Sequence, residues 1–195
     1  MTGSGNVKSI VMDAEGIERS LTRIAHQILE KNKGAENVAL VGIVTRGDLL
    51  AKRLVDKIEE IEGVRVPLGR LDISFYRDDF ATYVSPEVLS TDIMFDIDDR
   101  DVVLVDDVLY SGRTIRAALD ALMDIGRPET VQLAVLIDRG HRQLPIRADF
   151  VGKNVPSAKD ENVRLFLEET DGRSCVEILS IEDGKRAGSA PLGGE

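Results

Sequence analysis

The segment 102–114 constrains the fold of this chain more than any other part of its sequence. It reads Val-Val-Leu-Val-Asp-Asp-Val-Leu-Tyr-Ser-Gly-Arg-Thr. The apolar run 102–105 is typical of a parallel strand that is buried on both faces. Behind it, apolar residues recur at helical spacing: Ile115, Ala118, Leu119, Leu122 and Met123. The segment therefore predicts a strand, a loop and a helix, with Asp106 and Asp107 at the carboxyl end of the strand.

The loop between this strand and helix has the chemistry to bind a phosphorylated sugar. A helix N-terminus offers free backbone N–H groups to an anion, and Gly112 lets the main chain approach it closely. Ser111 and Thr114 add hydroxyl donors. The two aspartates, which only accept hydrogen bonds when ionised, suit sugar hydroxyls or a hydrated Mg²⁺. The loop thus predicts a ligand that carries both a phosphate and a diol.

Strands that alternate with helices predict an α/β fold, a doubly wound and mainly parallel sheet with flanking helices. No pattern precedes Ile10. Helices are expected from about Asp13 to Asn32 and over 48–61, and strands over 38–44, over 130–137 and near 148–151, 163–168 and 175–180. The stretch 77–101 contains seven Asp residues from Asp78 onward and has no clear period. It is interpreted as a flexible arm or hood, or equally as a solvated excursion.

Length and composition bound the class of protein. At 195 residues and 43% hydrophobic content, we expect one domain over 1–183 and a disordered tail over 184–195. No apolar run reaches the length of a membrane span, and the N-terminus lacks a basic-then-apolar layout, so a cytoplasmic protein is expected. Cys175 is the single cysteine, which excludes an intrachain disulfide, and we expect it to be buried in a late strand.

The loop resembles the phosphoribosyl-pyrophosphate (PRPP) signature of the type I phosphoribosyltransferases. Further motifs extend the match: Thr45-Arg46-Gly47, Tyr76-Arg77-Asp78-Asp79, Asp138-Arg139-Gly140-His141-Arg142 and Gly152-Lys153-Asn154-Val155-Pro156. Together they resemble a family of bacterial pyrimidine operon attenuation regulators that are also uracil phosphoribosyltransferases. The resemblance covers about residues 7–180.

This resemblance implies an enzyme that converts uracil and PRPP to UMP and pyrophosphate, with Mg²⁺ bound through PRPP and no metal ligated by the protein directly. The implied catalytic residues are Asp106, Asp107 and Arg46. The implied PRPP and nucleotide site comprises Thr45, Arg46, Gly47, Asp106, Asp107, Val108, Leu109, Tyr110, Ser111, Gly112, Arg113, Thr114, Arg139 and Val163. The sequence shows no activated nucleophile with a partner base, so no covalent intermediate is expected.

The resemblance also implies a second function, the binding of pyrimidine-operon leader mRNA by a homodimer or a higher homo-oligomer. The implied RNA-binding residues are Thr22, Arg23, His26, Arg142, Arg147 and Lys153. The net charge of −10 argues against general nucleic-acid binding, so any RNA contact must be local. Without the resemblance, a solvated helix face and ordinary surface arginines would be the favoured interpretation.

Two alternatives stay open at this point. The chain could be a uracil phosphoribosyltransferase of nucleotide salvage that does not bind RNA. A purine phosphoribosyltransferase ranks behind it, because such an enzyme would share the PRPP loop but not the motifs at 138–142 and 152–156.

Overall fold

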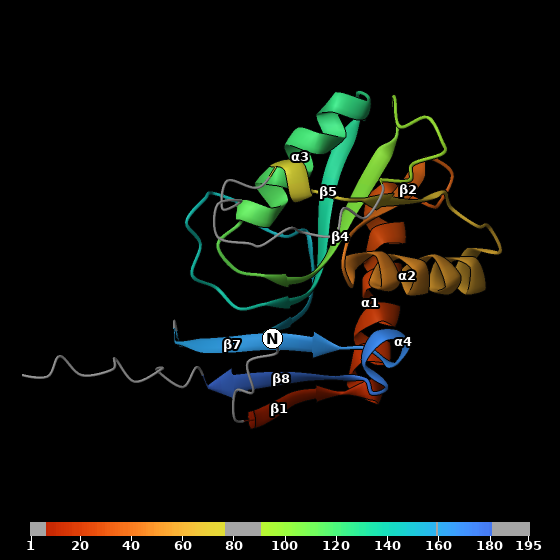
Figure 1. Ribbon diagram of the computed structural model, residues 1–195. Coiled ribbons are helices and arrows are strands. Elements are labelled where there is room, and N and C mark those ends of the chain that lie inside the picture. The colour runs from red at the N-terminus through yellow and green to blue at the C-terminus, as the bar shows by residue number, and fades with distance from the viewer. Residues whose placement is uncertain (1–6, 77–90, 159, 181–195) are drawn as a thin grey trace, which may run out of the picture.

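A five-stranded parallel sheet in the order β3-β2-β4-β5-β6 forms one part of the molecule, and a three-stranded antiparallel sheet in the order β1-β8-β7 lies below it in Figure 1. The computed structural model describes residues 7–76, 91–158 and 160–180. In chain order the elements are β1 Val7–Asp13, α1 Ala14–Asn32, β2 Val38–Ile43, α2 Gly47–Glu62, β3 Leu68–Leu71, the 3₁₀ turn Ser74–Tyr76, β4 Asp101–Leu109, α3 Arg113–Ile125, β5 Thr130–Asp138, β6 Phe150–Asn154, β7 Glu161–Phe166, α4 Glu168–Asp171 and β8 Cys175–Ser180.

Helices cover both faces of the parallel sheet, which explains the unbroken apolar run in β4. Val103 and Val105 face a core that also contains buried side chains of α1 and α2. Val102 and Leu104 face the opposite core, which contains the buried face of α3. All four side chains are fully or almost fully buried. The predicted α/β class with a mainly parallel sheet and flanking helices is confirmed.

The strand order creates a topological switch point between β2 and β4. The chain passes from β2 to β3 on one side, returns to β4 on the other side, and continues outward to β5 and β6. In open sheets of this kind the crevice for a ligand lies outside the carboxyl ends of the two strands that flank the switch. The turn after β2 and the loop after β4 are the segments that occupy this position.

The three-stranded sheet is not predicted by the sequence in full. Its strands β7 and β8 lie close to two of the predicted extended segments, but β1 begins at Val7, where no pattern was found. Val7 and Ile10 are exposed, so β1 has no continuous apolar face that would mark it. It is held by antiparallel pairing with β8 instead.

The helix ends follow the predicted signals closely. The Asp13 side chain caps α1 by accepting a hydrogen bond from the Gly16 N–H at 2.7 Å. Helix α3 buries Ile115 and Leu122 as expected, whereas Met123 is half exposed. Cys175 lies in β8, as expected, but is only partly buried.

The acidic stretch predicted as an arm is described only in part, because residues 77–90 lie outside the described residues. After them, Arg70 and Asp92 exchange two backbone hydrogen bonds of 2.8 and 2.9 Å. Ile97 is buried in the core beside α3, and Asp101 begins β4. The described part of this stretch is therefore anchored to β3 and to the core. The tail predicted over 184–195 also lies outside the described residues. No helix within the described ranges has the length and apolar character to cross a membrane.

Candidate active site

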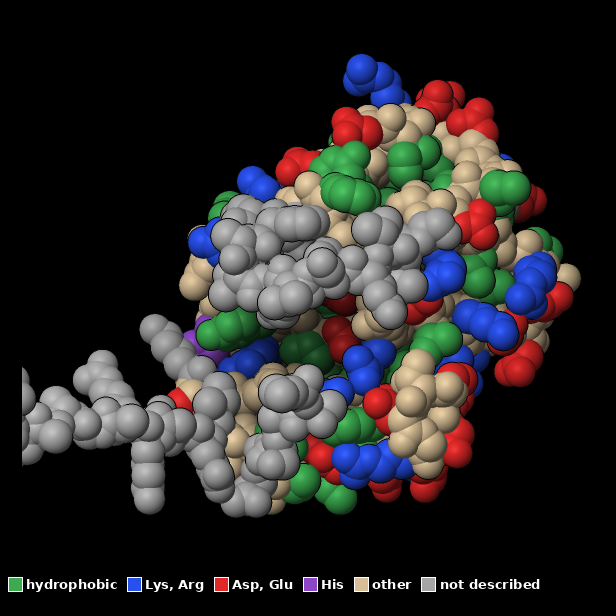
Figure 2. Space-filling view, viewed as in Figure 1, with side chains coloured by type: hydrophobic (Ala, Val, Ile, Leu, Met, Phe, Trp, Pro, Cys, Tyr) green, Lys and Arg blue, Asp and Glu red, His purple; other side chains and the backbone are tan. Residues whose placement is uncertain are grey.

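The structure brings the turn after β2 and the acidic end of β4 into contact. Pairing between β2 and β4 ends at Gly42 and Val105, while β4 continues beside β5 as far as Leu109. Gly47 packs so closely on β4 that a Cβ atom there would lie 2.4 Å from the Val105 carbonyl oxygen. Figure 2 shows acidic and basic side chains together in the hollow between the two sheets. The two predicted halves of the site thus share one crevice.

The paired carboxylates differ in their surroundings. Asp106 is 5% exposed, and its Oδ1 accepts a hydrogen bond from the Asp107 N–H at 2.9 Å. Asp107 accepts one from the Val108 N–H at 2.7 Å. Burial raises the pKa of Asp107, and the Val108 hydrogen bond and the charge of Arg46 offset this only in part.

Arg46 occupies an unusual backbone conformation in the turn before α2. Its φ is 72° and its ψ is −40°. The preceding residue of the turn, Thr45, is exposed. The Nη2 of Arg46 donates to both carboxylate oxygens of Asp171, at 3.0 and 3.2 Å. Its buried Nε has no acceptor among the described residues. Asp171 therefore holds one guanidinium nitrogen of Arg46, while another of its donors has no acceptor among the described residues.

The loop 108–114, which the sequence predicts to bind PRPP and which we call the PRPP loop, lies at the start of α3. Val108 and Leu109 complete β4, and the helix begins at Arg113. Gly112 has a φ of 92°, a left-handed conformation that suits glycine, and its carbonyl accepts the first helical hydrogen bond from Arg116 at 3.0 Å. The Ser111 hydroxyl oxygen accepts a hydrogen bond from the Arg113 N–H at 3.4 Å. The loop thus presents the N-terminus of a thirteen-residue helix to the crevice.

The segment after β5 supports this loop from behind. The Ser111 carbonyl accepts backbone hydrogen bonds from Gln143 and Leu144 at 3.0 and 3.2 Å. Arg142 donates to the carbonyl oxygens of Tyr110 and Ile146, each at 2.9 Å. It also pairs with Asp138.

A second cavity lies beside the loop, around Arg139. The guanidinium of Arg139 stacks over the Tyr110 ring at 4.3 Å and donates to Ser157 Oγ at 2.9 Å and to the Glu161 carbonyl at 2.7 Å. The cavity has a volume of about 390 Å³ and is lined by Asp138, Arg139, Gly140, His141, Asn154, Pro156 and Ser157. Val163 is buried in β7, two residues beyond Glu161. Arg139 therefore connects the PRPP loop to the start of β7.

Residues 9–168 match the family described as "Phosphoribosyl transferase domain". This chain belongs to the phosphoribosyltransferase family. It is 59% identical over 177 residues to "Bifunctional protein PyrR" of Deinococcus radiodurans, covering 90% of this chain and 97% of that protein. It is 54% identical over 180 residues to the protein of the same name from Bacillus subtilis, covering 91% of this chain and 99% of that one. The chain therefore also belongs to the group of proteins named Bifunctional protein PyrR.

Solved structures show the same fold at low sequence identity. A hypoxanthine-guanine phosphoribosyltransferase from Bacillus anthracis is 18% identical with a TM-score of 0.68, covering 89% of this chain and 99% of that chain. A hypoxanthine phosphoribosyltransferase from Trypanosoma cruzi, in complex with the product IMP, is 19% identical with a TM-score of 0.68, covering 89% of this chain and 91% of that chain. These likenesses establish a phosphoribosyltransferase fold.

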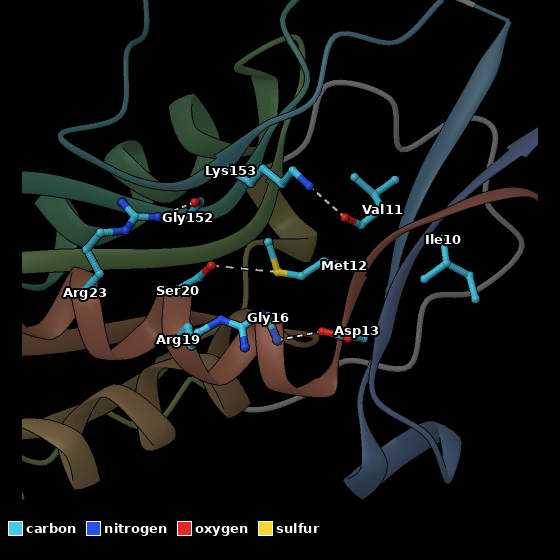
Figure 3. A pocket seen from close by; sticks show the side chains of 10 residues that line it. All are labelled: Ile10, Val11, Met12, Asp13, Gly16, Arg19, Ser20, Arg23, Gly152 and Lys153. Atoms are coloured by element: carbon cyan, nitrogen blue, oxygen red, sulfur yellow. Dashed lines mark hydrogen bonds between the residues drawn. The ribbon is translucent and has the colours of Figure 1, made fainter.

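The predicted RNA-binding residues of this phosphoribosyltransferase fall into two places. Four of them lie on the surface formed by α1 and β6, where Arg23 donates to the Val151 carbonyl at 3.1 Å and to the Gly152 carbonyl, and Lys153 donates to the Val11 carbonyl at 2.8 Å (Figure 3). Thr22 and His26 are exposed on α1. A cavity of about 440 Å³ lies between β1, α1 and β6.

The remaining two residues are placed differently. Arg142 is turned toward the active-site loop and makes its contacts there, while Arg147 is exposed on the segment that leads into β6. The surface of α1 also carries Glu15, Glu18 and Glu30. We use the name basic face for three exposed residues of the predicted set, Thr22 and His26 on α1 and Arg147 on the segment that leads into β6. Arg23 and Lys153 are exposed as well, but they donate to the main chain.

The sequence does not predict Asp171, the carboxylate that contacts Arg46. It ends a short acidic helix, α4, in a segment whose charges indicate a solvated turn and nothing more. Its contact with Arg46 spans 125 positions of the chain. No local pattern carries information about such a pair.

Proposed function

We propose that this phosphoribosyltransferase transfers the ribose phosphate of PRPP to uracil, and that the same chain binds pyrimidine-operon leader mRNA in response to UMP. The observation that carries the first function is the close packing of the Thr45-Arg46-Gly47 turn on the Val105–Asp106 end of β4, at the switch point of the sheet. The name Bifunctional protein PyrR, shared by relatives over nine-tenths of the chain, supports the assignment of two functions.

In this reaction a uracil ring nitrogen attacks the anomeric carbon of PRPP while the bond from that carbon to pyrophosphate breaks. The ring nitrogen loses its proton, and the products are UMP and pyrophosphate. The sugar gains positive charge in the transition state. Asp106 and Asp107 bind the ribose hydroxyls and stabilise that charge, and Arg46 stabilises the departing pyrophosphate. The loop 110–114 and the start of α3 hold the 5′-phosphate.

The donor set of the crevice fits Mg²⁺ that arrives with PRPP. Among the described residues, no group of three or more His, Cys, Asp or Glu side chains could hold a metal ion by itself. Asp106 and Asp107 would hold such an ion only through its water or together with oxygen atoms of PRPP. When bound, Mg²⁺ supplies positive charge against the pyrophosphate.

The cavity at Arg139 is the proposed site of the base. Arg139 lines this cavity, and its guanidinium stacks over the Tyr110 ring of the neighbouring loop. Strand β7 is the edge strand of its sheet, so one side of its main chain near Val163 is unpaired in the sheet. Backbone groups of an edge strand can recognise the polar edge of uracil.

The proposed RNA surface is the basic face of a homodimer or a higher homo-oligomer. Its exposed donors suit phosphates, 2′-hydroxyls and bases of a looped RNA. Arg23, Lys153 and Arg142 already donate to the protein main chain. We therefore assign Arg23 and Lys153 a structural role at the RNA surface, and Arg142 one at the PRPP loop, in addition to any RNA contact.

Turnover with defined bases tests the catalytic proposal. Uracil and PRPP with Mg²⁺ should yield UMP and pyrophosphate, whereas hypoxanthine and guanine should yield little or no nucleotide. Nucleotide formation from hypoxanthine or guanine in preference to uracil would contradict the proposal and would assign a purine enzyme.

A further inference from the structure

The contact between Arg46 and Asp171 joins the crevice to the three-stranded sheet. Arg46 belongs to the turn after β2, and Asp171 ends α4, which connects β7 to β8. The two side chains are 19% and 16% exposed, and one guanidinium nitrogen reaches both carboxylate oxygens. A partly buried, charge-assisted contact of this kind fixes geometry better than an exposed ion pair does.

The Asp171 carboxylate is also held by hydrogen bonds that do not involve Arg46. Its Oδ2 accepts hydrogen bonds from the Leu167 N–H at 2.9 Å and from the Thr170 hydroxyl at 2.8 Å. Partial burial acts to raise the pKa of Asp171, but these hydrogen bonds and the charge of Arg46 outweigh burial and lower the pKa. The carboxylate is therefore ionised at neutral pH and has a set orientation.

The α4 segment is anchored independently of Asp171. Glu169 accepts hydrogen bonds from Arg53 of α2, at 2.7 to 3.0 Å, and Arg53 also pairs with Glu18 of α1. The loss of one contact should leave the other, so the role of Asp171 can be tested without removing α4 from its place.

We propose that Asp171 is a positioning residue that holds the Arg46 guanidinium in place for the pyrophosphate group of PRPP, an inference that rests on the proposed transferase function. Arg46 has a left-handed backbone conformation, which a side chain adopts only when its surroundings impose it. Asp171 occupies Nη2, and the buried Nε has no acceptor among the described residues. A pyrophosphate oxygen provides the acceptor that Nε lacks. Preorganisation of this donor lowers the cost of ordering it at the moment of binding.

A double-mutant cycle tests this role. The variants are Asp171→Asn, Arg46→Gln and the double variant, with Glu169→Gln as the matched control on the same helix. We expect Asp171→Asn to reduce kcat/KM for PRPP about tenfold, and to weaken the binding of inorganic pyrophosphate measured by calorimetry in the same proportion. Glu169→Gln should change either quantity less than twofold.

The cycle separates a positioning role from a merely structural one. In the Arg46→Gln background, Asp171→Asn should have almost no further effect, because it acts through Arg46. Equal losses in both backgrounds would overturn the proposal, as would an increase in affinity for pyrophosphate, which would make Asp171 a competitor of the ligand. If Asp171→Asn does not fold, Thr170→Val, which removes the hydroxyl hydrogen bond to Asp171 and a longer one of 3.4 Å to the Leu167 carbonyl, should show a smaller loss in the same direction.

Failure of the proposed function has a different signature. In that case the wild-type protein would form no UMP from uracil and PRPP. The binding of inorganic pyrophosphate to the wild type and the three variants of the cycle would still support or overturn the role of Asp171.

Discussion

The environment of Asp107 disfavours its ionised carboxylate, the form to which we assign a role in the reaction. Burial raises its pKa, so the ionised form, to which we assign the stabilisation of the positive sugar, is the form that the folded protein accommodates poorly. Binding of a cationic or hydroxyl-rich ligand compensates this cost. A residue of this kind marks a site where local stability has been exchanged for function.

Substitution of Asp107 by Asn should separate these two effects. We expect Asp107→Asn to reduce kcat about a hundredfold, because the charge opposite the developing cation is lost. Since the folded pKa is raised, ionisation destabilises the wild type as pH rises above about 4, the usual range of an unfolded carboxyl group. Urea unfolding should therefore show Asp107→Asn to be the more stable protein at pH 7, with the difference vanishing at lower pH.

The matched control is Asp120→Asn on the exposed side of α3, where Asp120 forms a long contact of 3.9 Å with Arg116. It should change neither turnover nor the pH dependence of unfolding. A destabilised Asp107→Asn protein at pH 7 would contradict the assigned cause of the pKa shift.

Gly47 should tolerate no side chain. A Cβ atom there would lie 2.4 Å from the backbone oxygen of Val105, which cannot move without disturbing β4. We expect Gly47→Ala to lower the free energy of unfolding by about 3 kcal/mol and to reduce turnover by displacing the Arg46 turn. Gly69→Ala is the comparison, because its nearest neighbour is the flexible Ile93 side chain at 2.8 Å, and it should cost about 1 kcal/mol. Equal losses in the free energy of unfolding for Gly47→Ala and Gly69→Ala would show that the close approach of Gly47 to β4 does not exclude a side chain.

At this scale, the sequence predicts residues that lie in local motifs and misses those that act across the chain. Asp106, Gly112 and the start of α3 follow from a strand, a glycine and a helical period within twenty positions. The partner of Arg46 could not be found in this way, since Asp171 lies in an acidic run that is ordinary by itself.

At the scale of elements, cationic side chains link α1 to β6 and β6 to β1. Arg23 connects α1 to the main chain of β6, and Lys153 of β6 reaches the main chain of β1, as Figure 3 shows. The cationic side chains on this surface therefore hold three elements together. Their substitution should affect folding as well as any binding of RNA.

Thermal and urea unfolding can distinguish the side chains on this surface that link elements, such as Arg23, from those that we assign to RNA binding, such as His26. Arg23→Gln should lower the free energy of unfolding by about 1–2 kcal/mol, because two main-chain carbonyls lose their donor. His26→Gln, one helical turn away and exposed, should change it by less than about 0.5 kcal/mol. Equal stabilities of the two variants would contradict the structural role of Arg23.

Elements with buried faces were predicted well, and elements held by pairing were not. Strands β2, β4 and β5 are buried on both faces and stand out as apolar runs. Strand β1 is stabilised mainly by its ladder with β8, and its exposed Val7 and Ile10 gave no alternation to recognise. Backbone pairing between distant segments leaves no local signature.

At the scale of the whole molecule, the proposed active site and the proposed RNA surface share the same elements. Strand β6 and the segment before it contact the active-site loop through Arg142 and α1 through Gly152. The net charge of −10 restricts RNA to the places where donors are exposed. If UMP favours the RNA-competent state, then RNA must favour UMP binding by the same factor.

The most direct test of this account is the binding of a pyrimidine-operon leader hairpin from the protein's own host, measured with and without UMP over a salt series. The account predicts tight binding that UMP strengthens and that salt weakens with a shallow slope, as a small number of phosphate contacts requires. A His26→Gln/Arg147→Gln variant should lose this binding while it forms UMP at the wild-type rate. Binding no tighter than that of a scrambled hairpin, with UMP formation intact, would contradict the account and leave a salvage enzyme alone.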